Sequence, residues 1–202
     1  MLKFDANGNL TQNLQLGGSC WKGITSIHID KNQNLYISGG YGNDNFWTTS
    51  SCTCIFDGTS HTTTSTDIFL AKYDSLGNLL WINTIEANQN INTIRLNIDR
   101  NSIFLSGRVS NSNIPIDFGT YTLNYPSNYY TGSFVARYNT SGTFQWAKYY
   151  GAKGWDSYVY PHNIAILNSN TIIVGGKVLT QSESAHLYFQ NAAPLYGLSS
   201  SG

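Results

Sequence analysis

The stretch DIFLAKYDSLGNLLWINTI (residues 67–85) decides the fold, because its central phrase occurs three times along the chain. The three copies align without gaps: LKFDANGNL (2–10), AKYDSLGNL (71–79) and ARYNTSGTF (136–144). A second phrase follows each copy: LYISGG (35–40), IFLSGR (103–108) and IIVGGK (172–177). Self-similarity at a fixed period is the signature of a repeat architecture, and it takes precedence over every local pattern.

The glycines of the second phrase set the length of one repeat. Gly39, Gly107 and Gly175 lie 68 residues apart, and three such repeats account for nearly all of the 202 residues. We therefore expect three blade repeats, at 1–66, 67–132 and 133–202. The first lacks most of its opening strand, and the third stops before a further strand would begin. The chain is then either a piece of a longer array or one whose first residues close against its C-terminal end.

Each repeat is expected to hold four short antiparallel strands. In the second repeat, IFLAKYD (68–74) and LLWINTI (79–85) flank a turn that contains a glycine, as a tight hairpin requires. NTIRLNID (92–99) alternates apolar and polar residues, and IFLSGRV (103–109) is rich in apolar and β-branched residues. No helical periodicity of useful length is present. Four strands in a repeat of more than about 40 residues predict β-propeller blades.

The repeat is long for one blade because an insertion follows the fourth strand, at 41–66, 110–132 and 179–202. IDFGTYTL (116–123) predicts a small extra hairpin in the second insertion, and LYFQNAAPLY (187–196) occupies the corresponding place in the third. Known propellers have roughly four to eight blades. The predicted fold class is therefore all-β, with about three four-stranded blades that form part of a larger or oligomeric propeller.

The run at 67–85, followed by an alternating strand that ends in aspartate and then by IFLSG (103–107), resembles the bacterial propeller repeat known as SBBP. That repeat occurs in large secreted proteins, and the resemblance covers essentially the whole chain. It implies a propeller scaffold in a secreted or cell-surface protein, without shared catalytic residues. Gln12 departs from the pattern, because the other two repeats have Trp81 and Trp146 at this position.

The composition excludes several classes of partner. Only 11% of residues are charged, against about 25% in ordinary globular domains. Eleven acidic and eleven basic residues leave no basic face for a phosphate backbone, so no nucleic acid is expected. The apolar runs are far shorter than the roughly 20 residues of a membrane span, and no signal peptide opens the chain. We expect an extracellular or cell-surface location, with any targeting signal outside this segment.

The three cysteines, Cys20, Cys52 and Cys54, cannot all pair within one chain. Cys20 is able to bridge to Cys52 or to Cys54 if the first insertion folds back over the first blade, as suits a secreted protein. Structural zinc needs four ligands, and only His28 and His61 lie within one repeat of these cysteines. We expect a structural role and no metal.

Aromatic residues make up 14% of the chain, and many fall outside the expected strands. Trp and Tyr beside Asn and Asp suit sugar binding and also anchor protein interfaces. The stretch GWDSYVY (154–160) is the sharpest local candidate, although Trp155 and Tyr158 are equally able to pack between blades. The candidate ligand-binding residues are Trp47, Tyr129, Tyr130, Trp155, Asp156 and Tyr158.

The turns DANGN (5–9) and DKNQN (30–34) place oxygen atoms at alternate positions, as calcium loops do. They lack the distal acid of such loops, and so predict hairpin turns whose aspartate hydrogen-bonds its own backbone. A propeller glycosidase or lyase needs two convergent carboxylates, and most of the acids here lie at strand ends. We expect no catalytic residues and no cofactor.

The sequence predicts a non-enzymatic structural or adhesive module of a bacterial surface propeller, which presents its insertions to proteins or glycans. It also predicts contacts with further blades of the same or another chain. The alternative is a self-assembling, lectin-like propeller in which two or more chains close a ring. That alternative requires matching residues in every blade, whereas the insertions differ in length and sequence. A glycosidase or lyase is the weakest reading.

Overall fold

The computed structural model describes residues 1–43, 51–87, 91–99, 101–109, 114–126, 131–152, 158–168, 171–179 and 187–189. All regular secondary structure in these ranges is β, and every strand pair is antiparallel. The same ranges contain no helix long and apolar enough to cross a membrane. The strands are β1 (Leu2–Phe4), β2 (Leu10–Asn13), β3 (Gly17–Gly18), β4 (Trp21–Ile29), β5 (Leu35–Gly42), β6 (Cys52–Phe56), β7 (Thr59–Thr63), β8 (Thr66–Tyr73), β9 (Leu79–Ile85), β10 (Ile91–Asp99), β11 (Ser102–Val109), β12 (Ile116–Asp117), β13 (Thr122–Leu123), β14 (Gly132–Asn139), β15 (Phe144–Ala152), β16 (Tyr158–Asn168), β17 (Thr171–Leu179) and β18 (Leu187–Phe189).

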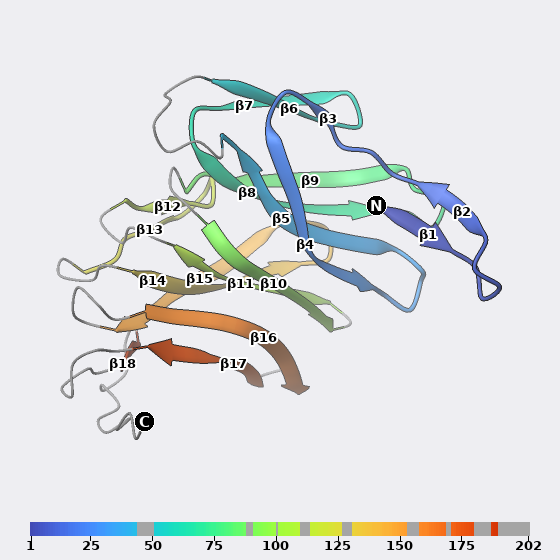
Figure 1. Cartoon of the computed structure of the whole chain (residues 1–202). Helices are drawn as coiled ribbons and strands as arrows, with labels where there is room; N and C mark the ends of the chain where they lie inside the picture. The colour runs from blue at the N-terminus through green and yellow to red at the C-terminus, as the bar shows by residue number, and fades with distance from the viewer. Residues whose placement is uncertain are drawn as a thin grey trace.

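Two sheets form the centre of the molecule (Figure 1). The first central sheet has the order β4-β5-β8-β9, and the second has the order β10-β11-β14-β15 with β18 added beside β15. Two-stranded sheets flank them, β1-β2 before and β16-β17 after. The first strands of successive sheets, β4, β10 and β16, contact one another in turn, as the inner strands of propeller blades do. The predicted all-β fold of four-stranded propeller-type blades is confirmed.

The sheets are offset by half a repeat from the repeats of the sequence. The four strands expected to form the second blade are β8, β9, β10 and β11, and they are divided between the two central sheets. Each central sheet takes two strands from one repeat and two from the next, because β5 pairs with β8, and β11 with β14, across an insertion. The limits at 66/67 and 132/133 therefore mark repeats of the sequence but not the edges of sheets. Local turn signals identify a hairpin, but they do not say which hairpins pair with each other.

The glycine of the second phrase is needed where the first strand of a sheet bulges. Gly39 pairs with Ile24 beside a bulge in β4, and a β-carbon there would collide with the carbonyl oxygen of Gly23. Gly176 approaches the carbonyl oxygen of Tyr160 in the same way, at the bulge of β16. The third counterpart of Gly39 is thus Gly176, one residue beyond the Gly175 that a constant spacing indicates.

The hydrophobic cores lie between successive sheets, and β8 supplies both of its faces to them. Ile68 and Leu70 face the second central sheet, where they join a core with Ile103, Leu105 and Phe134. Phe69, Ala71 and Tyr73 point the other way, into a core beneath β6. Both sets are fully buried, or nearly so. This near-continuous apolar run is what a strand covered on both faces requires.

Gln12 and Trp81 occupy the same position in their repeats, and the side chain of each forms a hydrogen bond to a hairpin turn of the following sheet. Trp81 donates a hydrogen bond from Nε1 to the carbonyl oxygen of Thr140 at 3.3 Å. Gln12 donates from Nε2 to the carbonyl oxygen of Leu76 at 2.8 Å, in the corresponding turn of the first central sheet. The glutamine thus replaces the polar function of the tryptophan. It does not replace the aromatic contact, in which Trp81 packs edge-on against Tyr36 at 6.1 Å between ring centroids.

The inserted segments fold back onto the preceding sheet. β6 pairs with β3 through Gly17↔Ile55 and Gly18↔Cys54, β12 bridges Glu86 beyond β9 through Asp117, and β18 pairs with the end of β15. We call β6, β12 and β18 the straps. β6-β7 and β12-β13 are hairpins, which confirms the hairpin predicted at 116–123. Phe56, the last residue of β6, packs on Phe69 at 5.1 Å between ring centroids, and Phe118, next to β12, packs on Phe134 at 5.8 Å. The first two insertions therefore pack these aromatic side chains into the core.

A disulfide fastens the first strap. Cys20, two residues after β3, is bonded to Cys52 at the start of β6, and Cys54 is a buried free thiol. Burial raises the pKa of the Cys54 thiol to about 11, so this cysteine is neutral at physiological pH.

The aspartate turns adopt the predicted self-bonded geometry. In the turn after β8, Asp74 Oδ1 accepts hydrogen bonds from the amides of Leu76 and Asn78, and the Asn78 side chain donates to Oδ2. Asp5 and Asp30 make the same contacts in their own turns. The hydrogen bond from the Asn78 side chain, followed by those from the backbone, lowers the pKa of Asp74 below its usual 3.8.

Candidate functional site

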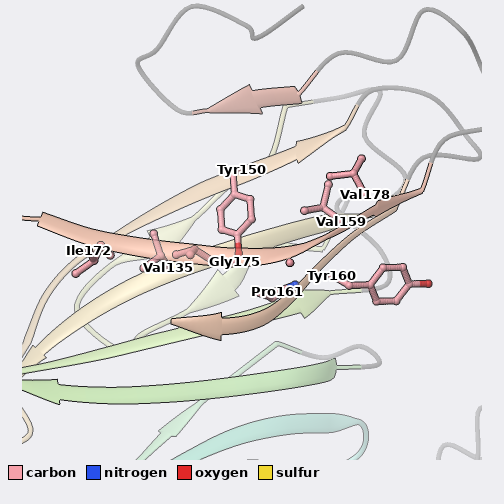
Figure 2. A pocket seen from close by; sticks show the side chains of 10 residues that line it. Val135, Tyr150, Val159, Tyr160, Pro161, Ile172, Gly175 and Val178 are labelled. Atoms are coloured by element: carbon pink, nitrogen blue, oxygen red, sulfur yellow. The ribbon is translucent and has the colours of Figure 1, made fainter. Parts of the chain in front are cut away.

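An apolar groove of about 400 Å³ lies between the second central sheet and the strand pair β16-β17 (Figure 2). Figure 2 shows Tyr150, Val159 and Val178 on β15, β16 and β17, around the groove. Pro161 on β16 has no backbone N–H group to donate. The full lining is Val135, Tyr150, Val159, Tyr160, Pro161, Ile172, Val174, Gly175, Gly176 and Val178. None of these side chains carries a formal charge at neutral pH.

The groove lies where a sheet-to-sheet core is only partly filled. Leu70 on β8 and Val135 on β14 occupy the same place in their repeats, and each faces the sheet that follows. Leu70 is fully buried, whereas Val135 is only half-buried and packs on a small core of Tyr150 and Val159.

Tyr150 provides a polar atom within this apolar surface. Its hydroxyl lies 2.9 Å from Ser106 Oγ, and Ser106 Oγ donates to the carbonyl oxygen of Phe134 at 2.8 Å. Burial raises the pKa of Tyr150 to about 12, so the phenol is neutral at physiological pH. The groove therefore offers neutral hydrogen-bonding groups, but no side chain suited to general acid–base work near neutral pH.

One of the predicted binding residues, Tyr158, lies beside the groove in a cation–π cluster. The guanidinium carbon of Arg108 is 5.4 Å from the ring centroid of Tyr158 and 4.6 Å from that of Tyr160, which lines the groove. Arg108 is only 8% exposed, and its Nε has no hydrogen-bond partner among the described residues. Two tyrosine rings partly offset the cost of burying this cation. Tyr158 on β16 thus contacts Arg108 on β11 of the second central sheet.

The other five predicted binding residues, Trp47, Tyr129, Tyr130, Trp155 and Asp156, lie outside the described residues. The groove itself was not predicted as a site, although one signal pointed to it. The repeat pattern indicates that a strand like DIFLAKY should follow IIVGGKVL (172–179), and such a strand would cover β17. Within the described ranges, no group of three or more His, Cys, Asp or Glu side chains is placed to hold a metal ion.

Comparisons with known proteins agree with a propeller-type repeat. No protein-family model matches the chain, and no solved structure matches it. Among curated proteins, it is similar to an uncharacterized WD repeat-containing protein of Acanthamoeba polyphaga mimivirus, at 27% identity over 187 residues that cover 78% of this chain. The chain spans about 13% of the length of that protein. The resemblance to the bacterial SBBP repeat gains no support from these comparisons.

Proposed function

We propose that this chain is a non-enzymatic binding module of a propeller-type repeat protein, and that its groove binds segments of other proteins. The observation that carries the proposal is an apolar groove beside β17, which has a pairing partner only on its β16 side among the described strands. An exposed sheet edge offers backbone donors and acceptors to a peptide, and the adjacent pockets select its side chains.

The chemistry of the groove favours a polypeptide over a sugar. Sugars are bound through several polar side chains around an aromatic ring, but the groove has no amide, carboxylate or basic side chain. Its polar side-chain atoms are the hydroxyls of Tyr150 and Tyr160, and the Tyr150 hydroxyl already contacts Ser106. Apolar side chains on an extended backbone match this surface better.

The proposal includes an adhesive role outside the cell. The Cys20–Cys52 disulfide supports an oxidising compartment, since such bonds are rare in the cytosol. The low content of charged residues suits an exposed repeat array, as the sequence suggested.

Selection from an unbiased displayed peptide library tests this function on the 202-residue chain. We expect enriched peptides whose binding is lost in Val178→Asp, which puts a charge into the groove. Leu167→Asp is the matched control, because Leu167 is an exposed apolar residue of β16 that does not line the groove. Circular dichroism checks that both variants remain folded. Peptides that bind both variants as well as the parent, or no enrichment at all, would refute a protein-binding groove.

A further inference from the structure

We infer that the edge of β17 that no described strand covers pairs with an extended strand carrying the pattern Phe-x-Ala-Lys/Arg-Tyr, antiparallel and with its phenylalanine opposite Gly176. This inference rests on the proposed function, because it names the kind of segment that the groove binds. It follows from three features that the two central sheets share and that β17 leaves incomplete.

The first feature is a constant register. β5 pairs with β8 through Gly39↔Phe69, and β11 pairs with β14 through Gly107↔Phe134. Two and four residues further along each pair, the partner strand supplies an alanine and then a tyrosine. Because Gly176 is the counterpart of Gly39 and Gly107, the same register sets phenylalanine opposite Gly176, alanine opposite Val174 and tyrosine opposite Ile172.

The second feature is the direction of these side chains. Phe134, Ala136 and Tyr138 all face the core between the central sheets, and so do Ile103 and Leu105, which pair with the last two. On β17, Ile172 and Val174 occupy the places of Ile103 and Leu105, and they line the groove. A strand in this register therefore directs its phenylalanine, alanine and tyrosine into the groove.

The third feature is a cation–π pair on the opposite face. Lys72 lies over the ring of Tyr36 at 5.0 Å, and Arg137 lies over the ring of Phe104 at 5.7 Å, in both cases between directly paired residues. Ile173 occupies the position of Tyr36 and Phe104 on β17, and it is 53% exposed. The basic residue of the incoming strand thus lies opposite an uncovered side chain.

A second copy of this chain fits the edge less well. β1 carries the related phrase MLKF (1–4) and pairs only with β2 among the described strands. In the shared register, these four residues reach from Ile172 to Gly175 and leave Gly176, Lys177 and Val178 without a partner. A full-length strand covers the phenylalanine position as well, so we favour a separate extended segment as the occupant.

The test uses the 202-residue chain and a labelled peptide GSFVARYN, the sequence of β14, with binding followed by fluorescence anisotropy. We expect saturable binding that weakens roughly tenfold or more when the phenylalanine of the peptide is replaced by alanine. N-methylation of alternate peptide residues keeps the side chains but removes backbone donors, and should abolish binding. These changes leave the protein untouched, so loss of folding cannot explain them.

A gain-of-binding variant tests the register. Ile173→Tyr restores the aromatic ring of the two central sheets at an exposed site, and should tighten binding roughly two- to fivefold. The gain should vanish when norleucine replaces the arginine of the peptide. Equal binding of a scrambled peptide, or no effect of the phenylalanine, would overturn the inference.

Two further outcomes separate the hypotheses. If library-selected peptides require an intact groove but GSFVARYN does not bind, the inference fails and the proposed function stands; if neither binds, both fail. Self-association of the chain in sedimentation velocity that the peptide cannot displace would assign the edge to a second copy, and would also overturn the inference.

Discussion

Two interfaces in this molecule are built from equivalent strands of successive repeats, but they are not equally complete. One lies between the two central sheets, and the other lies between the second central sheet and β16-β17. In the first interface, β14 pairs with β11, and Phe134, Ala136 and Tyr138 close the core. In the second, the described strands supply no counterpart of β14, and a groove remains. The comparison teaches that the two-stranded pair that begins a sheet does not by itself complete the core toward the preceding sheet.

The largest difference in stability is expected between side-chain truncations on the two faces of β14. Phe134 is fully buried in the complete interface, so Phe134→Ala should lower the free energy of unfolding by about 3–5 kcal/mol. Val135→Ala, the adjacent residue facing the groove, should cost about 1 kcal/mol, because Val135 is only half-buried. Urea denaturation followed by tryptophan fluorescence measures both. Equal costs would contradict the distinction between a complete and an open interface.

Removal of the disulfide should weaken the first strap specifically. Cys20 and Cys52 are 32 residues apart, and releasing a loop of this size should cost about 2–4 kcal/mol. Thermal unfolding of the Cys20→Ser/Cys52→Ser double variant, compared with the parent chain, measures the loss.

Alkylation supplies the control for that measurement. Cys54 is buried, and burial raises its pKa to about 11, so iodoacetamide should modify it only after unfolding. Fast modification of Cys54 in the folded parent chain would show that β6 is not held against the core as described.

Replacing Trp81 by the glutamine that the first repeat has at this position should lower stability by a smaller amount. Trp81→Gln copies the residue of the first repeat, so it should keep the bond to the Thr140 carbonyl and lose the contact with Tyr36. We expect a cost of about 1–2 kcal/mol, and about 1 kcal/mol more for Trp81→Ala, which loses the hydrogen bond as well. Chemical denaturation distinguishes them. Identical losses for the two variants would argue against the bridging role assigned to Gln12.

The pH dependence of the aspartate turns should be the smallest effect. Hydrogen bonds lower the pKa of Asp74 in the folded chain, so the unfolded chain binds more protons. The stabilisation is present above the unfolded pKa near 3.8, and is lost as the pH falls through the folded value. Asp74→Asn should therefore show a smaller loss of melting temperature between pH 7 and pH 2.5.

The third repeat already provides the precedent for that variant. Asn139 occupies the corresponding turn, and its Oδ1 accepts from the amides of Ser141 and Thr143. A steeper acid dependence in Asp74→Asn than in the parent chain would refute the assignment of the carboxylate.

The sequence was sufficient for the hairpins but not for their grouping into sheets. Turn phrases such as Asp74–Asn78 and the alternation at 92–99 are local signals, and the structure forms β8-β9 and β10-β11 where they indicate. The pairing of β5 with β8 depends on contacts across an insertion, which no local pattern encodes. The groove was likewise not predicted as a site, because it is defined by a strand position that no described strand fills.

The partner of Cys20 shows the same limit on a smaller scale. Cys52 and Cys54 are two residues apart on one strand, so both side chains lie on the same face of β6. The antiparallel register decides between them: Gly18 pairs with Cys54, and two residues later Cys20 reaches Cys52. That register is visible only once β3 and β6 are paired.

The half-repeat offset has a consequence for how such a chain can change in length. Duplication or deletion of one 68-residue unit anywhere along the array rejoins a leading strand pair with a trailing one of the same kind. Every internal sheet then keeps four strands, and every strap still finds a preceding sheet to bond. A junction placed inside an exposed turn leaves every strand intact, so we expect such a change of length to disturb folding least there.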